Sequence, residues 1–145
     1  MPQPGDTYSL GATEHLTLTI LSPELLELEA TWDPSAEHRP LAHRHPNQDE
    51  HFVVHAGELT AVVDGVERVL GPGDTLDIPR GVAHSMHNSG AGEARATWQV
   101  RPALRTAELW ATLDAVGRAG DGSLPTPEEG AALLAEYAPE FELVF

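Results

Sequence analysis

The feature that most constrains this chain is a set of four potential metal ligands. His43, His45 and Glu50 lie in one short segment, and His84 lies in a second segment further along the chain. Side chains of a strand alternate between its two faces, so His43 and His45 share a face if their segment is extended. Glu50 and His84 can then converge on them from neighbouring strands. Three imidazoles and one carboxylate suit a divalent transition metal and leave coordination positions open for a substrate.

The residues around these ligands follow a regular spacing. In the first segment a His-x-His pair is followed by a glutamate and then a glycine, at His43, His45, Glu50 and Gly57. The second segment carries a glycine, a Pro-x-Gly turn, a histidine and an asparagine, at Gly73, Pro79, Gly81, His84 and Asn88. This spacing resembles the two motifs of the cupin superfamily. The first motif of that family usually opens with glycine, where this chain has Glu37. That is a turn position, so the departure leaves the ligand set intact.

The resemblance implies an all-β fold, a cupin jelly-roll β-barrel (double-stranded β-helix), here followed by two C-terminal α-helices. We expect a single domain over residues 1–145, with the barrel at about 10–101 and the helical extension at about 104–138. By the same resemblance we expect a homodimer. Function does not follow from the fold, because the superfamily carries many activities.

The alternation of apolar residues supports the barrel independently. Leu16, Leu18 and Ile20 alternate with polar residues, as do the apolar residues from Leu26 to Trp32, so both stretches are expected to be half-buried strands. Between two β-rich runs, Asp64-Gly65 predicts a type I′ hairpin.

The last third of the chain has helical spacing instead. Apolar residues from Leu109 to Val116 predict a helix that stops at Gly117. Thr126-Pro127-Glu128-Glu129 is a complete helix-start signature for a second helix, which should run to about Tyr137. The tail alternates again at Phe141, Leu143 and Phe145. We expect the two helices to pack on the outside of the barrel.

Strand parity gives candidates for the pocket wall. Phe52 and Val54 share the face of Glu50, and Met86 shares the face of His84. On the late strand, either Ala96, Trp98 and Val100 or Thr97, Gln99 and Arg101 face inward, and the apolar set fits a core better. We therefore predict a pocket lined by Phe52, Val54, Met86 and Trp98. A mostly apolar lining favours a neutral or aromatic substrate over a sugar phosphate.

The remaining histidines lack this support. We interpret them as surface or packing residues: His15, His38, His51, His55 and His87. Asp49 should face away from Glu50, and Asn88 should have a structural role.

Composition and charge limit the classes of partner that this chain can bind. The formal net charge is −15, from 23 acidic residues against 8 basic ones, all of them arginine. Such a chain is repelled by nucleic acid and by anionic membrane surfaces. Cysteine is absent, which excludes disulfides and thiolate metal sites. We find neither a signal-peptide pattern nor an apolar run near the ~20 residues of a membrane helix, and therefore expect a cytoplasmic protein.

The leading hypothesis is a metal-dependent oxygenase, resembling cupin dioxygenases. One divalent Fe, Mn, Ni, Co, Cu or Zn ion per chain would be held by His43, His45, Glu50 and His84, with a chelating enol, phenol or thiol as substrate and O₂ as co-substrate. Glu50 would double as a catalytic general base if it swings off the metal. Two alternatives stay open: a redox-neutral isomerase, cyclase or lyase with the same ligands, and a non-enzymatic small-molecule-binding protein.

Overall fold

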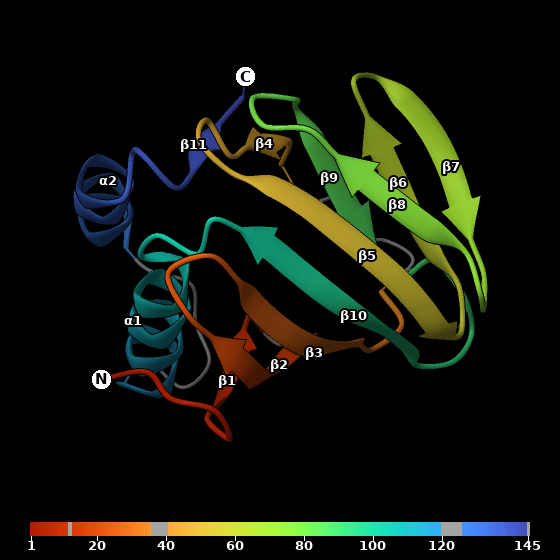
Figure 1. Ribbon diagram of the computed structural model, residues 1–145, viewed down its shortest axis with the longest axis horizontal. Coiled ribbons are helices and arrows are strands. Elements are labelled where there is room, and N and C mark those ends of the chain that lie inside the picture. The colour runs from red at the N-terminus through yellow and green to blue at the C-terminus, as the bar shows by residue number, and fades with distance from the viewer. Residues whose placement is uncertain (12, 36–40, 120–125, 145) are drawn as a thin grey trace.

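The computed structural model describes residues 1–11, 13–35, 41–119 and 126–144, and its strands form two antiparallel sheets. The six-stranded sheet has the order β1 (Thr7–Leu10), β2 (Glu14–Leu21), β3 (Leu26–Trp32), β10 (Ala94–Arg101), β5 (Asp49–Ala56) and β8 (Thr75–Ile78). The five-stranded sheet has the order β11 (Glu142–Leu143), β4 (His43–Arg44), β9 (His84–His87), β6 (Leu59–Val63) and β7 (Val66–Leu70). Figure 1 shows the two sheets enclosing a common interior. The predicted all-β jelly roll is confirmed.

The barrel interior is filled by the alternating apolar side chains of its strands. In β3 the burial alternates strictly, with Leu26, Leu28 and Ala30 fully buried. In β10 the buried set is Ala96, Trp98 and Val100, so the apolar face of this strand is the inner one, as predicted. Burial of each large apolar side chain contributes about 1.5–3 kcal/mol. This core fixes which side chains of each strand face inward, including those of the site.

One predicted strand pattern is wrong at its end. Leu16 and Leu18 are buried in β2, but Ile20 is 41% exposed. The pairing of β2 with β3 shifts register between Leu18 and Ile20. Such an irregularity reverses the alternation of faces beyond it, so Ile20 points away from the core although its spacing matches that of the two leucines.

The hairpin between β6 and β7 has the predicted turn. Asp64 has φ +49° and Gly65 has φ +79°, and both central residues of a type I′ turn require positive φ. The residues on either side of the turn, Val63 and Val66, pair across it.

Two helices follow the barrel: α1 (Thr106–Ala119) and α2 (Pro127–Glu136). Thr126 caps α2 with a capping box that includes Glu129, as predicted. The predicted stop of α1 at Gly117 is wrong, because the helix continues to Ala119. Glycine weakens a helix interior by only about 1 kcal/mol relative to alanine, and the Arg118–Asp114 ion pair spans this turn with an N–O distance of 2.9 Å.

The helices lie together on one side of the molecule, and β11 lies between α2 and β4 (Figure 1). The backbone N–H of Ser9 in β1 donates to the Asp114 carboxylate in α1 over 2.9 Å, which ties α1 to the barrel. Neither helix is long and apolar enough to cross a membrane in the part of the chain that is described. Glu37, His38 and Phe145, named above, lie outside the described residues.

Glu14, at the start of β2, is an inward-facing acid away from the predicted ligands. Its Oε1 accepts a hydrogen bond from the Trp32 indole over 3.0 Å. Burial is the largest cause that raises the pKa of Glu14, to about 7, and the charge of Glu50 adds to it, against the lowering effect of the Trp32 bond. A raised folded-state pKa means that folding stability falls as pH rises between about 4.5 and about 7.

We predict that Glu14→Gln stabilises the protein at about pH 8 and is nearly neutral at about pH 4. The amide oxygen can still accept from Trp32, and no charge is then buried. Because Glu14 is only partly buried, the expected gain at the higher pH is discounted to about 1–2 kcal/mol. Urea unfolding at both pH values measures it, with exposed Glu67→Gln as the matched control. An equal effect of Glu14→Gln at both pH values would contradict the prediction.

Candidate metal centre

The three predicted histidine ligands meet where β4 and β9 lie side by side. His43 in β4 pairs directly with His84 in β9, and His45 follows β4 immediately. One ligating atom from each of these three imidazoles lies within 4.8 Å of the others. His45 and His84 are buried, and His43 is half-buried. The sheet pairing thus brings together residues from both sequence segments.

Glu50 enters the cluster from β5, in the opposite sheet. Its Oε1 lies 2.8 Å from Nε2 of His84 and 3.1 Å from Nε2 of His45. The Glu50 side chain is almost completely buried. All four residues proposed from the sequence are therefore close together in space.

The hydrogen bonds of Nδ1 fix the orientation of the His45 and His84 rings. Nδ1 of His45 lies 2.8 Å from the carbonyl oxygen of Glu140, and Nδ1 of His84 lies 3.0 Å from that of Val82. A carbonyl can only accept, so Nδ1 carries the hydrogen in both rings, and in a neutral ring Nε2 carries the lone pair. These backbone bonds aim both Nε2 lone pairs at Oε1 of Glu50.

The centre therefore brings together atoms that carry lone pairs and lack a hydrogen bond between them. Nε2 of His45 and Oε1 of Glu50 are buried, and neither has a hydrogen-bond partner among the described residues. Buried donors and acceptors are ordinarily paired, and an unpaired group costs about 1–3 kcal/mol. A cation placed between these atoms would satisfy them. The donor set fits a divalent transition metal.

The protonation states of His43 and Glu50 agree with this donor set, whereas that of His45 does not. Burial, followed by the neighbouring His84 and His45, lowers the pKa of His43 to about 3 and keeps the ring neutral. Burial opposes charge on Glu50, but His45 and His84 outweigh it and hold the pKa of this carboxyl well below its usual range. Metal ligands must be deprotonated in this way. His45 differs: burial opposes its charge, but Glu50 and the Glu140 carbonyl raise its pKa.

A buried tryptophan fixes the carboxylate of Glu50. The indole Nε1 of Trp98, in β10, donates to Oε2 of Glu50 over 2.6 Å. Phe52 stacks on the Trp98 ring with a centroid distance of 5.5 Å. Such outer contacts orient ligands and are typical of metal sites. Trp98 was proposed from the sequence as a pocket residue only, because strand parity gives a side chain's face but not its partner.

The C-terminal segment contributes a contact that the sequence analysis missed. β11 pairs with β4, so that Leu143 lies opposite His43. Phe141 stacks on the His43 ring at a centroid distance of 4.9 Å and an interplanar angle of 19°. The alternation of Phe141 and Leu143 was the signal of a strand, but nothing local indicates which edge it joins.

The other predicted pocket residues take part in the barrel core. Phe52 and Val54 are buried, and Met86 is half-buried and packs against the same cluster. Their contact with a substrate stays a prediction. Asn88 is fully buried and donates to the carbonyls of Trp32 and Gly92, which is a structural role.

The remaining described histidines lie away from the centre. His15 contacts Asp33, His51 contacts Asp77, and His55 contacts Thr97, all on the outer face. His87 is the exception, because it is buried at the end of β9. Asp49 faces solvent and pairs with Arg80 over 3.0 Å. Parity had placed His51, His55 and Asp49 on the face opposite Glu50.

Comparison with known proteins agrees with this fold. Residues 29–100 match the Cupin_2 family model, described as a cupin domain. KdgF from a Halomonas species is 20% identical, with 67% of this chain and 87% of that chain covered and a TM-score of 0.60. An RmlC-like cupin from Shewanella frigidimarina is 24% identical, with 70% and 87% covered and a TM-score of 0.61. A sugar phosphate isomerase of the cupin superfamily from Silicibacter pomeroyi is 21% identical, with 69% and 75% covered and a TM-score of 0.58.

No curated protein matches the chain. The three solved structures named above are distant in sequence, so their likeness shows the fold and not the reaction. With the domain match and the motif residues in place, the chain is a small cupin.

Proposed function

We propose that this cupin is a metal-dependent enzyme acting on a small molecule, and that it is an oxygenase of a metal-chelating enol, phenol or thiol. The observation that carries the proposal is the buried cluster in which Nε2 of His45, Nε2 of His84 and Oε1 of Glu50 converge. His43 completes the donor set. Three neutral or neutralisable imidazoles and one carboxylate suit a redox-active ion as well as zinc.

When bound, the ion would supply Lewis acidity and a fixed point for the substrate oxygen or sulfur. The chain's own residues would orient the carboxylate and accept the proton. Trp98 holds Oε2 of Glu50, so the carboxylate presents Oε1 in one orientation. If Glu50 swings off the metal, Oε1 is the atom at which it would receive a proton from an enol or phenol as general base.

The surroundings favour an uncharged or aromatic substrate. The side chains packed around the four residues include the aromatic rings of Trp98, Phe52 and Phe141. Every arginine that the structure describes is at least partly exposed, so among these residues none is buried beside the centre to hold a phosphate. The resemblance to cupins leads us to propose a homodimer, which sedimentation would test.

A redox-neutral isomerase, cyclase or lyase is the second candidate. It is favoured by the fixed Glu50 carboxylate, which serves proton transfer without any oxidant. Zinc as the native ion would suit this reaction and would not suit oxygen chemistry.

We predict about one equivalent of Fe, Mn, Ni, Co or Cu per chain in protein purified without chelators. With a panel of enols, phenols and thiols, a dissolved-oxygen electrode should then record oxygen uptake together with substrate loss. The control is the same reaction under strict anoxia, where turnover should cease. Full turnover without oxygen would reject the oxygenase and support the redox-neutral enzyme. Ligand-induced thermal stabilisation with no turnover would support the third hypothesis, a non-enzymatic binding protein.

A further inference from the structure

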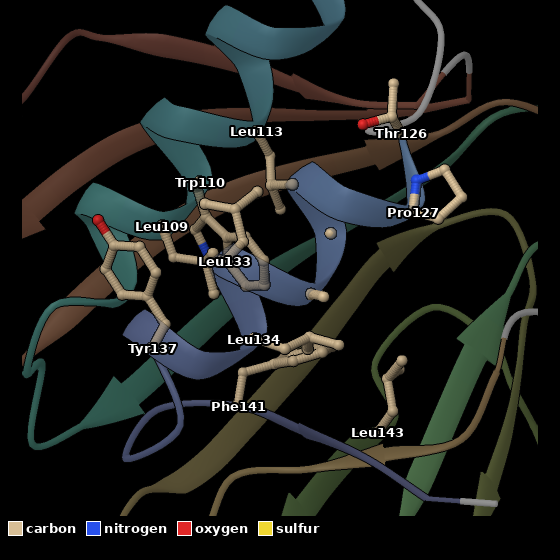
Figure 2. Close-up of a pocket in the computed structure, with 12 residues that line it drawn as sticks. Leu109, Trp110, Leu113, Thr126, Pro127, Leu133, Leu134, Tyr137, Phe141 and Leu143 are labelled. Carbon is tan, nitrogen blue, oxygen red and sulfur yellow. The ribbon is translucent and has the colours of Figure 1, made fainter.

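A second cavity lies outside the metal centre, between the two helices and the C-terminal segment (Figure 2). Its volume is about 550 Å³, within the range of about 300–1,000 Å³ that is usual for small-molecule sites. α1 contributes Leu109, Trp110 and Leu113, while Phe141 lies on the side of the C-terminal segment. The cavity is large enough for a molecule of two fused aromatic rings.

The helix that borders the cavity, α2, has an apolar side that is only partly buried. None of the described residues of α2 is buried, although Leu133 and Leu134 belong to it and line the cavity. A ten-residue helix is marginal alone and is usually stabilised by packing of its apolar face. Apolar contents in the cavity would supply that packing.

The cavity wall also contains an unpartnered hydrogen-bond donor. Trp110 is only 5% exposed, and its indole Nε1 has no hydrogen-bond partner within the described part of the chain. Figure 2 shows this indole among the lining side chains. Nε1 itself has almost no accessible surface, so an acceptor inside the cavity would recover the cost of about 1–3 kcal/mol for an unpartnered buried N–H once the indole turns toward it.

We propose that this cavity binds a neutral, mostly apolar small molecule that carries a hydrogen-bond acceptor for Trp110, of the class of aromatic ketones and esters. Charge supports the neutral class. The lining contains no charged side chain among the described residues, and the net charge of −15 disfavours anions. The site does not rest on the proposed reaction. It shares Phe141 with the metal centre, where this ring stacks on His43.

Gly130 offers a direct test, because it lines the cavity and a Cβ built on it meets nothing within 4 Å. Gly130→Leu would place a side chain in the cavity and also raise helix propensity, so α2 should stay folded. The matched control is Ala132→Leu, on an exposed position of α2 that is not part of the lining. The neutral fluorophore N-phenyl-1-naphthylamine serves as the probe.

We expect wild-type protein and Ala132→Leu to bind this probe equally, and Gly130→Leu to bind it about tenfold more weakly or worse. Circular dichroism confirms that each variant is folded. Equal affinity of Gly130→Leu and wild type would overturn the proposal, as would the absence of saturable binding to wild type.

The hydrogen bond is tested with two competitors of similar shape, 2-acetylnaphthalene and its hydrocarbon analogue 2-isopropenylnaphthalene. Wild type should prefer the ketone by about five- to tenfold, and Trp110→Phe, which keeps the aromatic wall, should remove the preference. A preference that survives in Trp110→Phe would overturn the assigned role of Trp110.

Discussion

Substitution of His84 with alanine is expected to weaken metal binding by roughly 100-fold or more. Even the loss of a residue that only hydrogen-bonds a metal ligand lowers metal affinity by about 10–100-fold. His84 supplies a buried Nε2 that faces Glu50 over 2.8 Å, and its Nδ1 is already held by the Val82 carbonyl. The barrel should stay folded, because β9 retains its backbone pairing with β6 and β4.

The measurement is metal content by elemental analysis after equilibration against a buffered series of free metal concentrations. His51→Ala is the matched control. His51 also contacts a carboxylate, Asp77, over 2.7 Å, but on the outside of the barrel. The control should retain wild-type affinity. A full equivalent retained by His84→Ala, at the same free metal concentration as wild type, would show that the proposed ligand set is wrong.

The sequence located the candidate site because its determinants are local. Strand alternation and turn spacing are properties of short segments. Alternation placed His43 and His45 on one face, and the resemblance to the cupin motifs implied that Glu50 and His84 converge on them. The Asp64-Gly65 turn and the Thr126 cap were predicted for the same reason, since each depends on a few adjacent residues.

The features that the sequence did not reveal all depend on distant partners. Ile20 changes face because of a register shift in the pairing of β2 with β3, and no residue type in β2 indicates that shift. The bond from Trp98 to Glu50 joins two strands. The docking of β11 on β4 places Phe141 over His43, and only the folded chain determines which sheet edge the tail joins. Gly117 was misread because a glycine usually ends a helix by adopting a left-handed conformation, and this glycine keeps helical geometry.

The motif glycine Gly57 carries the second large expected effect, on stability. Its φ is +74°, a conformation that costs an L-residue about 1–2 kcal/mol. A Cβ at this position would lie 2.5 Å from the carbonyl oxygen of Glu93 and 2.8 Å from Cα of Ala94. Both obstacles are backbone atoms, and Ala94 is held in β10 by its pairing with Trp32. Neither can move aside without disturbing the central strand of the six-stranded sheet.

Gly57→Ala should therefore lower the free energy of unfolding by about 2–5 kcal/mol, the sum of conformational strain and overpacking. Gly65→Ala separates the two contributions. Gly65 has φ +79°, but a Cβ there meets nothing within 4 Å, so only the conformational cost applies. Urea unfolding of wild type and both variants measures the difference, which we expect to be about 1–3 kcal/mol. Equal destabilisation of the two variants would mean that the backbone at Glu93 and Ala94 yields freely, and that the close approach of β5 to β10 does not explain why glycine stands at this position.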